Sequence, residues 1–290
     1  VTLKWEKVGE KGVNGGYVDP TRVEYQVWNV TASGTLGGLI GKVTDASELK
    51  FKFNTVSQTR AIQNWVVVPV NETGGTQTAK FNIPLGPAYE LPFEESFAGG
   101  STTNDWWLNV GGNYRWYTCT DTSVDDDGGC ASYMSIPGEY SIMNSYRIDL
   151  GSASSPTLVF SYNGEKGTNV VLDVYVRDNR GVTKMVKRIN FAEKTTDDWE
   201  VAEISLADFV SSKYIFLSFD ARGTDAGPVS VFVDKLSITD DSGVESVVAD
   251  KVTNSDIYSL QGIKLRSNTS DTTGLPAGVY IVAGQKVYVK

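Results

Sequence analysis

The chain has 290 residues, which is enough for two domains with an appendage, and its 40% hydrophobic and 11% aromatic content is sufficient for packed cores. Histidine is absent, which excludes Ser-His-Asp and Cys-His catalysis and every histidine-ligated metal site. The formal net charge of −9 makes nucleic acid an unfavourable partner, and no apolar run approaches the roughly 20 residues that a membrane span requires.

Alternation of apolar and polar residues dominates the chain, while apolar stripes with helical spacing are missing. We therefore predict an all-β protein whose strands lie at 23–30, 49–54, 65–70, 78–85, 157–163, 170–178, 213–220, 229–239 and 278–282. A single helical turn is predicted within 205–212. Short strands separated by Asn-Gly and Asp-Gly turns are typical of sandwiches and jelly rolls.

Two seams divide the sequence into three segments. The first is Pro84-Leu85-Gly86-Pro87, where two prolines and a glycine interrupt strand pairing. The second is the acidic, glycine-containing stretch 239–244. The predicted domains are therefore 1–86, 87–243 and 244–290. Because the chain opens on Val1 with no initiator methionine or apolar leader, we expect any signal peptide to have been removed or to lie outside it.

The first segment resembles a fibronectin type III sandwich, on the residues 1–5, 23–27 and 65–74. The resemblance implies that Trp5 is the core tryptophan of the second strand. Only four residues precede it, so we expect either that the first strand of that fold is missing from this chain or that the module is cut within a larger protein.

The second segment is similar to the cleaved-adhesin or MAM-like jelly rolls, a concanavalin-like sandwich, of secreted Bacteroidetes surface proteins. The similarity rests on the order and spacing of 91–97, Trp106 or Trp107, 145–150, 158–162, Trp199 and 232–238. The third segment, through 275–282 and 286–290, resembles the C-terminal sorting region of type IX secretion cargo, and we expect a small β appendage.

Each signature strand of the second segment places one carboxylate among apolar residues at alternate positions. Glu95 stands with Phe93 and Phe97, and Asp234 stands with Phe232 and the following apolar residues Leu236 and Ile238. Burying an ionised carboxylate requires compensation, and a hard divalent cation supplies it. The jelly-roll resemblance implies a structural Ca²⁺ held by Glu95 and Asp234. Hydrogen bonds from the backbone, or pairing with Arg or Lys, remain the alternatives.

Cys119 and Cys130 flank a ten-residue polar loop, and we expect them to form an intramolecular disulfide in an oxidising compartment. Two unrelated thiols are the alternative. The loop between them contains Asp121 and 125–127, but it lacks the ligand spacing of an EF-hand, so a solvated turn is the favoured interpretation.

Aromatic residues gather between glycine-rich turns at Trp106, Trp107 and Trp116, and such residues are candidates for stacking on sugar rings. Packing in the core is the competing interpretation. Because Trp106 and Trp107 are adjacent in an extended segment, their side chains must point to opposite faces.

We predict a non-catalytic protein, secreted or on the outer cell surface, whose jelly roll recognises a glycan or a host surface protein. The sequence lacks a nucleophile elbow and a phosphate loop, and nothing in it selects a catalytic carboxylate pair. The alternative is a set of ancillary modules belonging to a secreted peptidase or glycosidase whose catalytic domain lies upstream.

Overall fold

The computed structural model describes every residue except 1, 32–33, 55–57, 78–79, 152, 225–226, 241–255, 260–262, 268, 283–284 and 290. The chain forms two compact units, Val1–Ser242 and Gly243–Lys290. The predicted seam at 239–244 lies largely outside the described residues.

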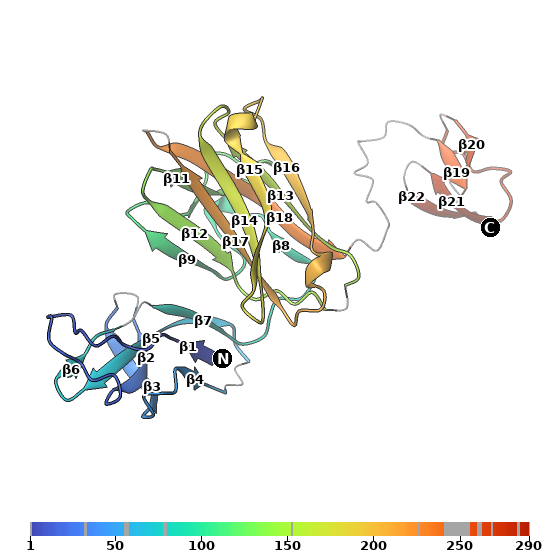
Figure 1. Cartoon of the computed structure of the whole chain (residues 1–290). Helices are drawn as coiled ribbons and strands as arrows, with labels where there is room; N and C mark the ends of the chain where they lie inside the picture. The colour runs from blue at the N-terminus through green and yellow to red at the C-terminus, as the bar shows by residue number, and fades with distance from the viewer. Residues whose placement is uncertain are drawn as a thin grey trace. The chain divides into compact units, whose positions relative to one another are not determined.

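The all-β prediction is confirmed (Figure 1). Within the described residues the only helices are three short 3₁₀ turns, η1 (Ala98–Gly100), η2 (Phe191–Glu193) and η3 (Ala207–Phe209). None of the described helices is long and apolar enough to cross a membrane.

Two sheets form the first segment. The larger has the order β3 (Leu36–Val43), β2 (Glu24–Val30), β5 (Ala61–Asn71), β6 (Gly74–Gly75), with β7 (Phe81–Leu85) also on β5. The smaller joins β1 (Thr2–Lys4) to β4 (Lys50–Lys52).

The core of this segment is centred on Trp65, which is fully buried and packs edge-on against Phe53. Trp5 is only half-buried and contacts Tyr25 with ring centroids 5.3 Å apart. The central tryptophan is therefore Trp65 on the long strand β5, and the core role expected for Trp5 is corrected: Trp5, which directly follows β1, is only partly buried against the same core.

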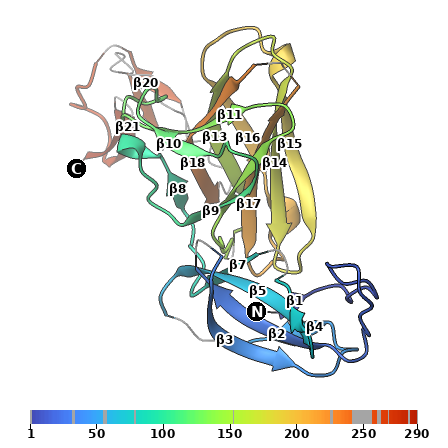
Figure 2. The ribbon, with the colours of Figure 1, turned by 90° about the vertical axis from the view of Figure 1, so that its left-hand side faces the viewer.

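Two facing sheets form the second segment (Figures 1 and 2). The six-stranded sheet has the order β10 (Tyr117–Cys119), β11 (Cys130–Ser135), β18 (Val229–Asp240), β13 (Pro156–Gly164), β16 (Glu200–Ser205), with β8 (Phe93–Glu95) also on β18. The five-stranded sheet has the order β15 (Thr183–Asn190), β14 (Val170–Asp178), β17 (Ile215–Gly223), β12 (Tyr140–Ser145), β9 (Trp106–Gly111).

Inward residues of both sheets share one hydrophobic core. Phe160 of β13 and Phe219 of β17 meet across it edge to face, with centroids 5.3 Å apart. Burial of an aromatic side chain of this size contributes about 1.5–3 kcal/mol. The core therefore fixes which side of each strand faces inward and which side is left for function.

The second unit is a four-stranded antiparallel sheet with the order β20 (Lys264–Arg266), β19 (Ile257–Ser259), β21 (Gly278–Val282), β22 (Gln285–Val289). Ile257, Tyr280 and Val282 form its small core. Lys264 pairs with the buried Asp256 at 2.6 Å.

Candidate functional site

Glu95 ends β8 with a buried carboxylate that accepts six hydrogen bonds. The donors are the amide of Phe97 (3.3 Å), the amide and hydroxyl of Thr103 (3.0 and 2.9 Å), the amide and side chain of Asn104 (3.0 and 3.2 Å) and Nε1 of Trp106 (2.9 Å). A carboxylate has about four lone-pair sites, so these donors saturate it. The structure therefore favours the hydrogen-bonded alternative over the predicted calcium role for Glu95.

Asp234 is fully buried on β18, beside a bulge. Lys235 has a φ of +49°, and the register with β13 shifts at this point. Asp234 pairs with Ser161, whereas Ser237 pairs with Val159. A bulge inserts one residue and reverses the alternation of faces beyond it.

The predicted common face of Phe232, Asp234, Leu236 and Ile238 is therefore wrong. Leu236 and Ile238 lie in the core together with Val233. Phe232 is outside the core cluster, half-buried against Trp199 with ring centroids 6.2 Å apart. Residue parity holds along a regular strand only, and β18 is irregular at Lys235.

Two backbone amides donate to the Asp234 carboxylate, from Val124 at 2.8 Å and from Lys235 at 2.7 Å. Burial raises the pKa of Asp234 to about 6, and the nearby carboxylates of Asp125 and Asp127 add to that rise. Asp234 thus ties the polar loop after Cys119 to β18.

Strands β8 and β18 are neighbours, with Glu95 opposite Leu236. However, the described residues contain no group of three or more Cys, Asp or Glu residues that could hold a metal ion. With two amide donors and two neighbouring carboxylates, Asp234 suits a divalent cation better than the saturated Glu95 does. Calcium at Asp234 stays a prediction.

Two of the three candidate tryptophans, Trp106 and Trp116, pack in the core of the sandwich. Trp116 is buried, stacks on Tyr133 and donates Nε1 to the carbonyl of Ser141 at 2.8 Å. Trp106 faces the core and is held by Glu95, while Trp107 lies on the opposite side of β9. Trp106 and Trp107 point to opposite faces of the strand, as predicted, but the three tryptophan rings do not form one exposed platform.

Cys119 and Cys130 lie directly opposite each other on β10 and β11. Both thiols are buried and free, with their sulfur atoms 3.1 Å apart. Burial raises the pKa of the Cys130 thiol, and the adjacent Cys119 adds to the rise. The disulfide stays a prediction, and the pairing of β10 with β11 brings the two cysteine side chains next to each other.

The outer face of the five-stranded sheet is its side turned away from the core. Alternate residues of β14 and β17, such as Val174 and Phe219, enter the core, so their neighbours along each strand form this outer face. Its principal residues are Trp107, Asn109, Tyr140, Asn144, Asp173, Tyr175, Arg177, Met185, Arg188, Phe216, Ser218, Asp220 and Arg222. The face combines aromatic rings with carboxylates, guanidinium groups and two amides.

Two buried aspartates occupy the middle of the outer face. Asp173 (5% exposed) and Asp220 (4% exposed) are register partners on β14 and β17. Arg188 binds Asp173 through Nε and Nη2, both at 2.7 Å. Arg222 binds Asp220 through Nε at 3.0 Å and Nη2 at 2.8 Å. These bonds raise the pKa of each arginine.

Aromatic rings flank the aspartates on both sides. Arg222 lies over Tyr140 at 5.5 Å from the ring centre. Tyr175 lies beside Asp173, and its pKa is raised by burial and by that carboxylate. At the other end, Trp107 and Phe216 meet edge to face at 5.6 Å. Rings and hydrogen-bonding groups therefore alternate along the sheet.

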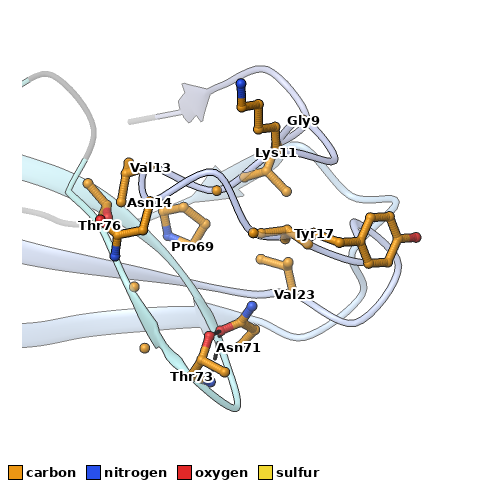
Figure 3. Close-up of a pocket in the computed structure, with 16 residues that line it drawn as sticks. Gly9, Lys11, Val13, Asn14, Tyr17, Val23, Pro69, Asn71, Thr73 and Thr76 are labelled. Atoms are coloured by element: carbon orange, nitrogen blue, oxygen red, sulfur yellow. Dashed lines mark hydrogen bonds between the residues drawn. The ribbon is translucent and has the colours of Figure 1, made fainter.

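Two other hollows are present, of which the second shares Arg188 with this face. An open groove in the first segment runs between the loop 8–18 and the β5–β6 turn, and the Tyr17 ring points away from it (Figure 3). Its lining contains a single charged residue, Lys11, among the described residues. The second hollow, beside β15, lies next to the buried Lys194, whose ammonium group donates to the carbonyls of Thr196 and Asp198.

Comparisons with known proteins give a fold likeness only. No protein-family model matches the sequence, and no curated protein matches it. Among solved structures, the K1 cleaved adhesin domain of Lys-gingipain from Porphyromonas gingivalis W83 is 14% identical and covers 51% of this chain and 96% of its own, with a TM-score of 0.39.

Two carbohydrate-binding modules are similar at the same level. TmCBM61, solved with β-1,4-galactotriose, is 15% identical and covers 50% of this chain and 94% of its own, with a TM-score of 0.41. The CBM22-1 xylan-binding domain from Paenibacillus barcinonensis Xyn10C is 15% identical over 53% of this chain and 96% of its own, with a TM-score of 0.36.

The outer face was missed by sequence reasoning, although a signal for it exists. Asp173, Tyr175 and Arg177 alternate along one strand, and 216–222 supplies a second run of the same kind. Polar residues at alternate positions normally indicate a solvated side, so burial of the two aspartates is the information that only the folded chain provides.

Proposed function

We propose that the chain is a non-catalytic, extracellular binding protein that recognises a glycan with the outer face of its five-stranded sheet. The observation that carries the proposal is the alternation of rings with fixed hydrogen-bonding groups on that face. Sugar rings present both apolar C–H surfaces and hydroxyl groups, so they are complementary to such a mixed surface.

A glycan fits this face better than a protein does. The centres of protein–protein interfaces are depleted in charged residues, whereas two carboxylates lie at the centre of this face. The carboxylates hold the half-exposed side chains of Arg188 and Arg222 in place, so little side-chain freedom is lost when a hydroxyl group binds these guanidinium groups.

The same geometry supports a non-catalytic role. Glycosidases need one carboxyl group as a general acid and another that is free to act as a base or nucleophile. Asp173 and Asp220 are each occupied by a guanidinium group. Binding without cleavage is therefore the chemistry expected of the pair.

Affinity electrophoresis in gels containing soluble polysaccharides tests the proposal. Tyr140→Ala removes a ring that is 38% exposed on the outer face, and Tyr117→Ala removes one that is 49% exposed on β10 of the other sheet. We expect at least one polysaccharide to retard the native chain. Tyr140→Ala should lose that retardation, whereas Tyr117→Ala should be retarded as much as the native chain. Equal behaviour of the two variants, or no retardation by any polysaccharide, would overturn the proposal.

A further inference from the structure

Arginines on and beside the outer face fall into two kinds. Arg188 and Arg222 are neutralised by Asp173 and Asp220. Arg177 and Arg147, by contrast, form no ion pair with a carboxylate in the described part of the chain. In a chain with a net charge of −9, two partly buried guanidinium groups without a carboxylate need an explanation.

Arg177 lies over an aromatic ring. It is the register partner of Phe216, and its guanidinium carbon is 4.3 Å from the centre of that ring. Burial lowers the pKa of Arg177, and no carboxylate offsets the effect. The contact with Phe216 holds the guanidinium group of Arg177 beside the outer face, and its N–H donors have no carboxylate partner among the described residues.

Arg147 reaches the neighbouring ring, Tyr214, at 5.3 Å from its centre. Tyr214 and Phe216 meet edge to face at 5.6 Å, so the two arginines flank one aromatic pair. Arg147 donates through Nη2 to the carbonyl of Gly86 and to the hydroxyl of Tyr146, and its Nε is buried without a hydrogen-bond partner. A buried donor left without a partner costs about 1–3 kcal/mol in other proteins, so such groups indicate a missing partner.

We propose that the Arg147–Arg177 end of the outer face binds the acidic group of a glycan, a uronic acid carboxylate or a sulfate ester. This inference rests on the proposed function, because it names the class of sugar for the same face. Planar guanidinium groups bind two oxygens of such anions at once, and partial burial strengthens the contact. Arg188 and Arg222 are neutralised by their aspartates, so the centre of the face would contact the uncharged part of the same ligand.

The test uses the full chain and ligands that differ in charge alone. Isothermal titration compares oligogalacturonate with its methyl ester, which keeps the sugar backbone and removes the carboxylates, and dextran sulfate with dextran. Arg177→Gln removes the guanidinium group, and Arg177→Lys keeps the positive charge but loses the planar arrangement of N–H donors. The charge-matched control is Arg22→Gln, which removes an arginine that forms an exposed ion pair with Glu72. Thermal melting of each variant establishes that it folds.

We expect an acidic ligand to bind at least about tenfold more tightly than its neutral counterpart, and Arg177→Gln to abolish that difference. Arg177→Lys should retain part of it, and Arg22→Gln all of it. Binding of oligogalacturonate alone identifies a carboxylate ligand, and binding of dextran sulfate alone identifies a sulfate ligand. Equal affinity for charged and neutral ligands, with binding still lost in Tyr140→Ala, would overturn this inference and leave the proposed function standing. Absence of binding to every glycan would overturn both.

Discussion

Asp173 and Asp220 face each other across β14 and β17, and each carboxylate is held by an arginine of its own. Like charges directly opposite each other destabilise a sheet, so the two guanidinium groups are what makes this pair tolerable. The pairs behave as one four-residue network, and its members should not contribute independently to stability.

Arg188→Gln is expected to lower the melting temperature, because it leaves Asp173 buried beside Asp220 without its partner. Adding Asp173→Asn to that variant should recover much of the loss, since it removes the unpaired charge. Thermal melts of Arg188→Gln, of Asp173→Asn and of the double variant, compared with the native chain, form a double-mutant cycle. Additive losses would show that the residues do not act as a network.

Glu95→Gln should destabilise the fold by about 2–4 kcal/mol, because an amide group would turn N–H donors toward the N–H donors that now bind the carboxylate. The matched control is Glu94→Gln on the same strand, where the side chain is exposed and a change within about 0.5 kcal/mol is expected. Urea unfolding measures both. Equal effects of the two substitutions would contradict the role assigned to Glu95.

Asp234 should make the chain less stable as the pH rises. Its pKa in the folded chain is about 6, above the ordinary 3.8, so between these values the folded state holds more protons than the unfolded state. The stabilisation is present below about pH 4 and lost by about pH 6. In chelator, the melting temperature of Asp234→Asn minus that of the native chain should grow over this interval. A difference that stays constant with pH would contradict the prediction.

Calcium, if it binds at Asp234, should raise the melting temperature of the native chain relative to excess chelator. A ligand that binds only the folded state at 100 times its Kd stabilises by about 2.7 kcal/mol. Asp234→Asn should lose this response. Because the donors around Glu95 already saturate its carboxylate, the melting temperature of Glu95→Gln should be lower but still rise with Ca²⁺. Identical melts of the native chain in Ca²⁺ and chelator would refute a calcium site.

Cys119 and Cys130 are expected to be joined in the protein isolated from an oxidising compartment. Closure of a loop this short contributes about 2–3 kcal/mol, so reduction should lower stability by that amount. Thiol labelling of the denatured, unreduced protein should find no free thiol, and a Cys119→Ser/Cys130→Ser variant should not respond to reductant. Two labelled thiols per chain would refute the bond.

Sequence reasoning located strands whose side chains alternate regularly. The runs 170–178 and 278–282 coincide with β14 and β21, and the helical turn predicted within 205–212 contains η3. It missed the sandwich strands β9, β11, β12 and β16. It also missed β3, which is rich in glycine and mostly exposed, and β15, an edge strand with polar residues on both faces. In these strands backbone pairing, rather than an apolar pattern, determines the structure.

The site was harder to predict because its two determinants are not local. The bulge at Lys235 depends on how β18 pairs with β13, and it reversed the faces inferred for Asp234 and Leu236. The carboxylates of Asp173 and Asp220 meet only when β14 and β17 pair. Spacing along a single strand contains neither piece of information.

The pairing of β8 with β18 also determines how the second segment responds to mechanical load. Phe93 at the start of β8 pairs with Ile238 near the end of β18, so the chain enters and leaves at the same end of this antiparallel pair. Tension applied through these two points would break the hydrogen bonds between β8 and β18 one after another, starting at Phe93, rather than all at once. The separation of the two strands then reaches Glu95. Its six hydrogen bonds to the residues that follow it would have to break before the chain could extend further.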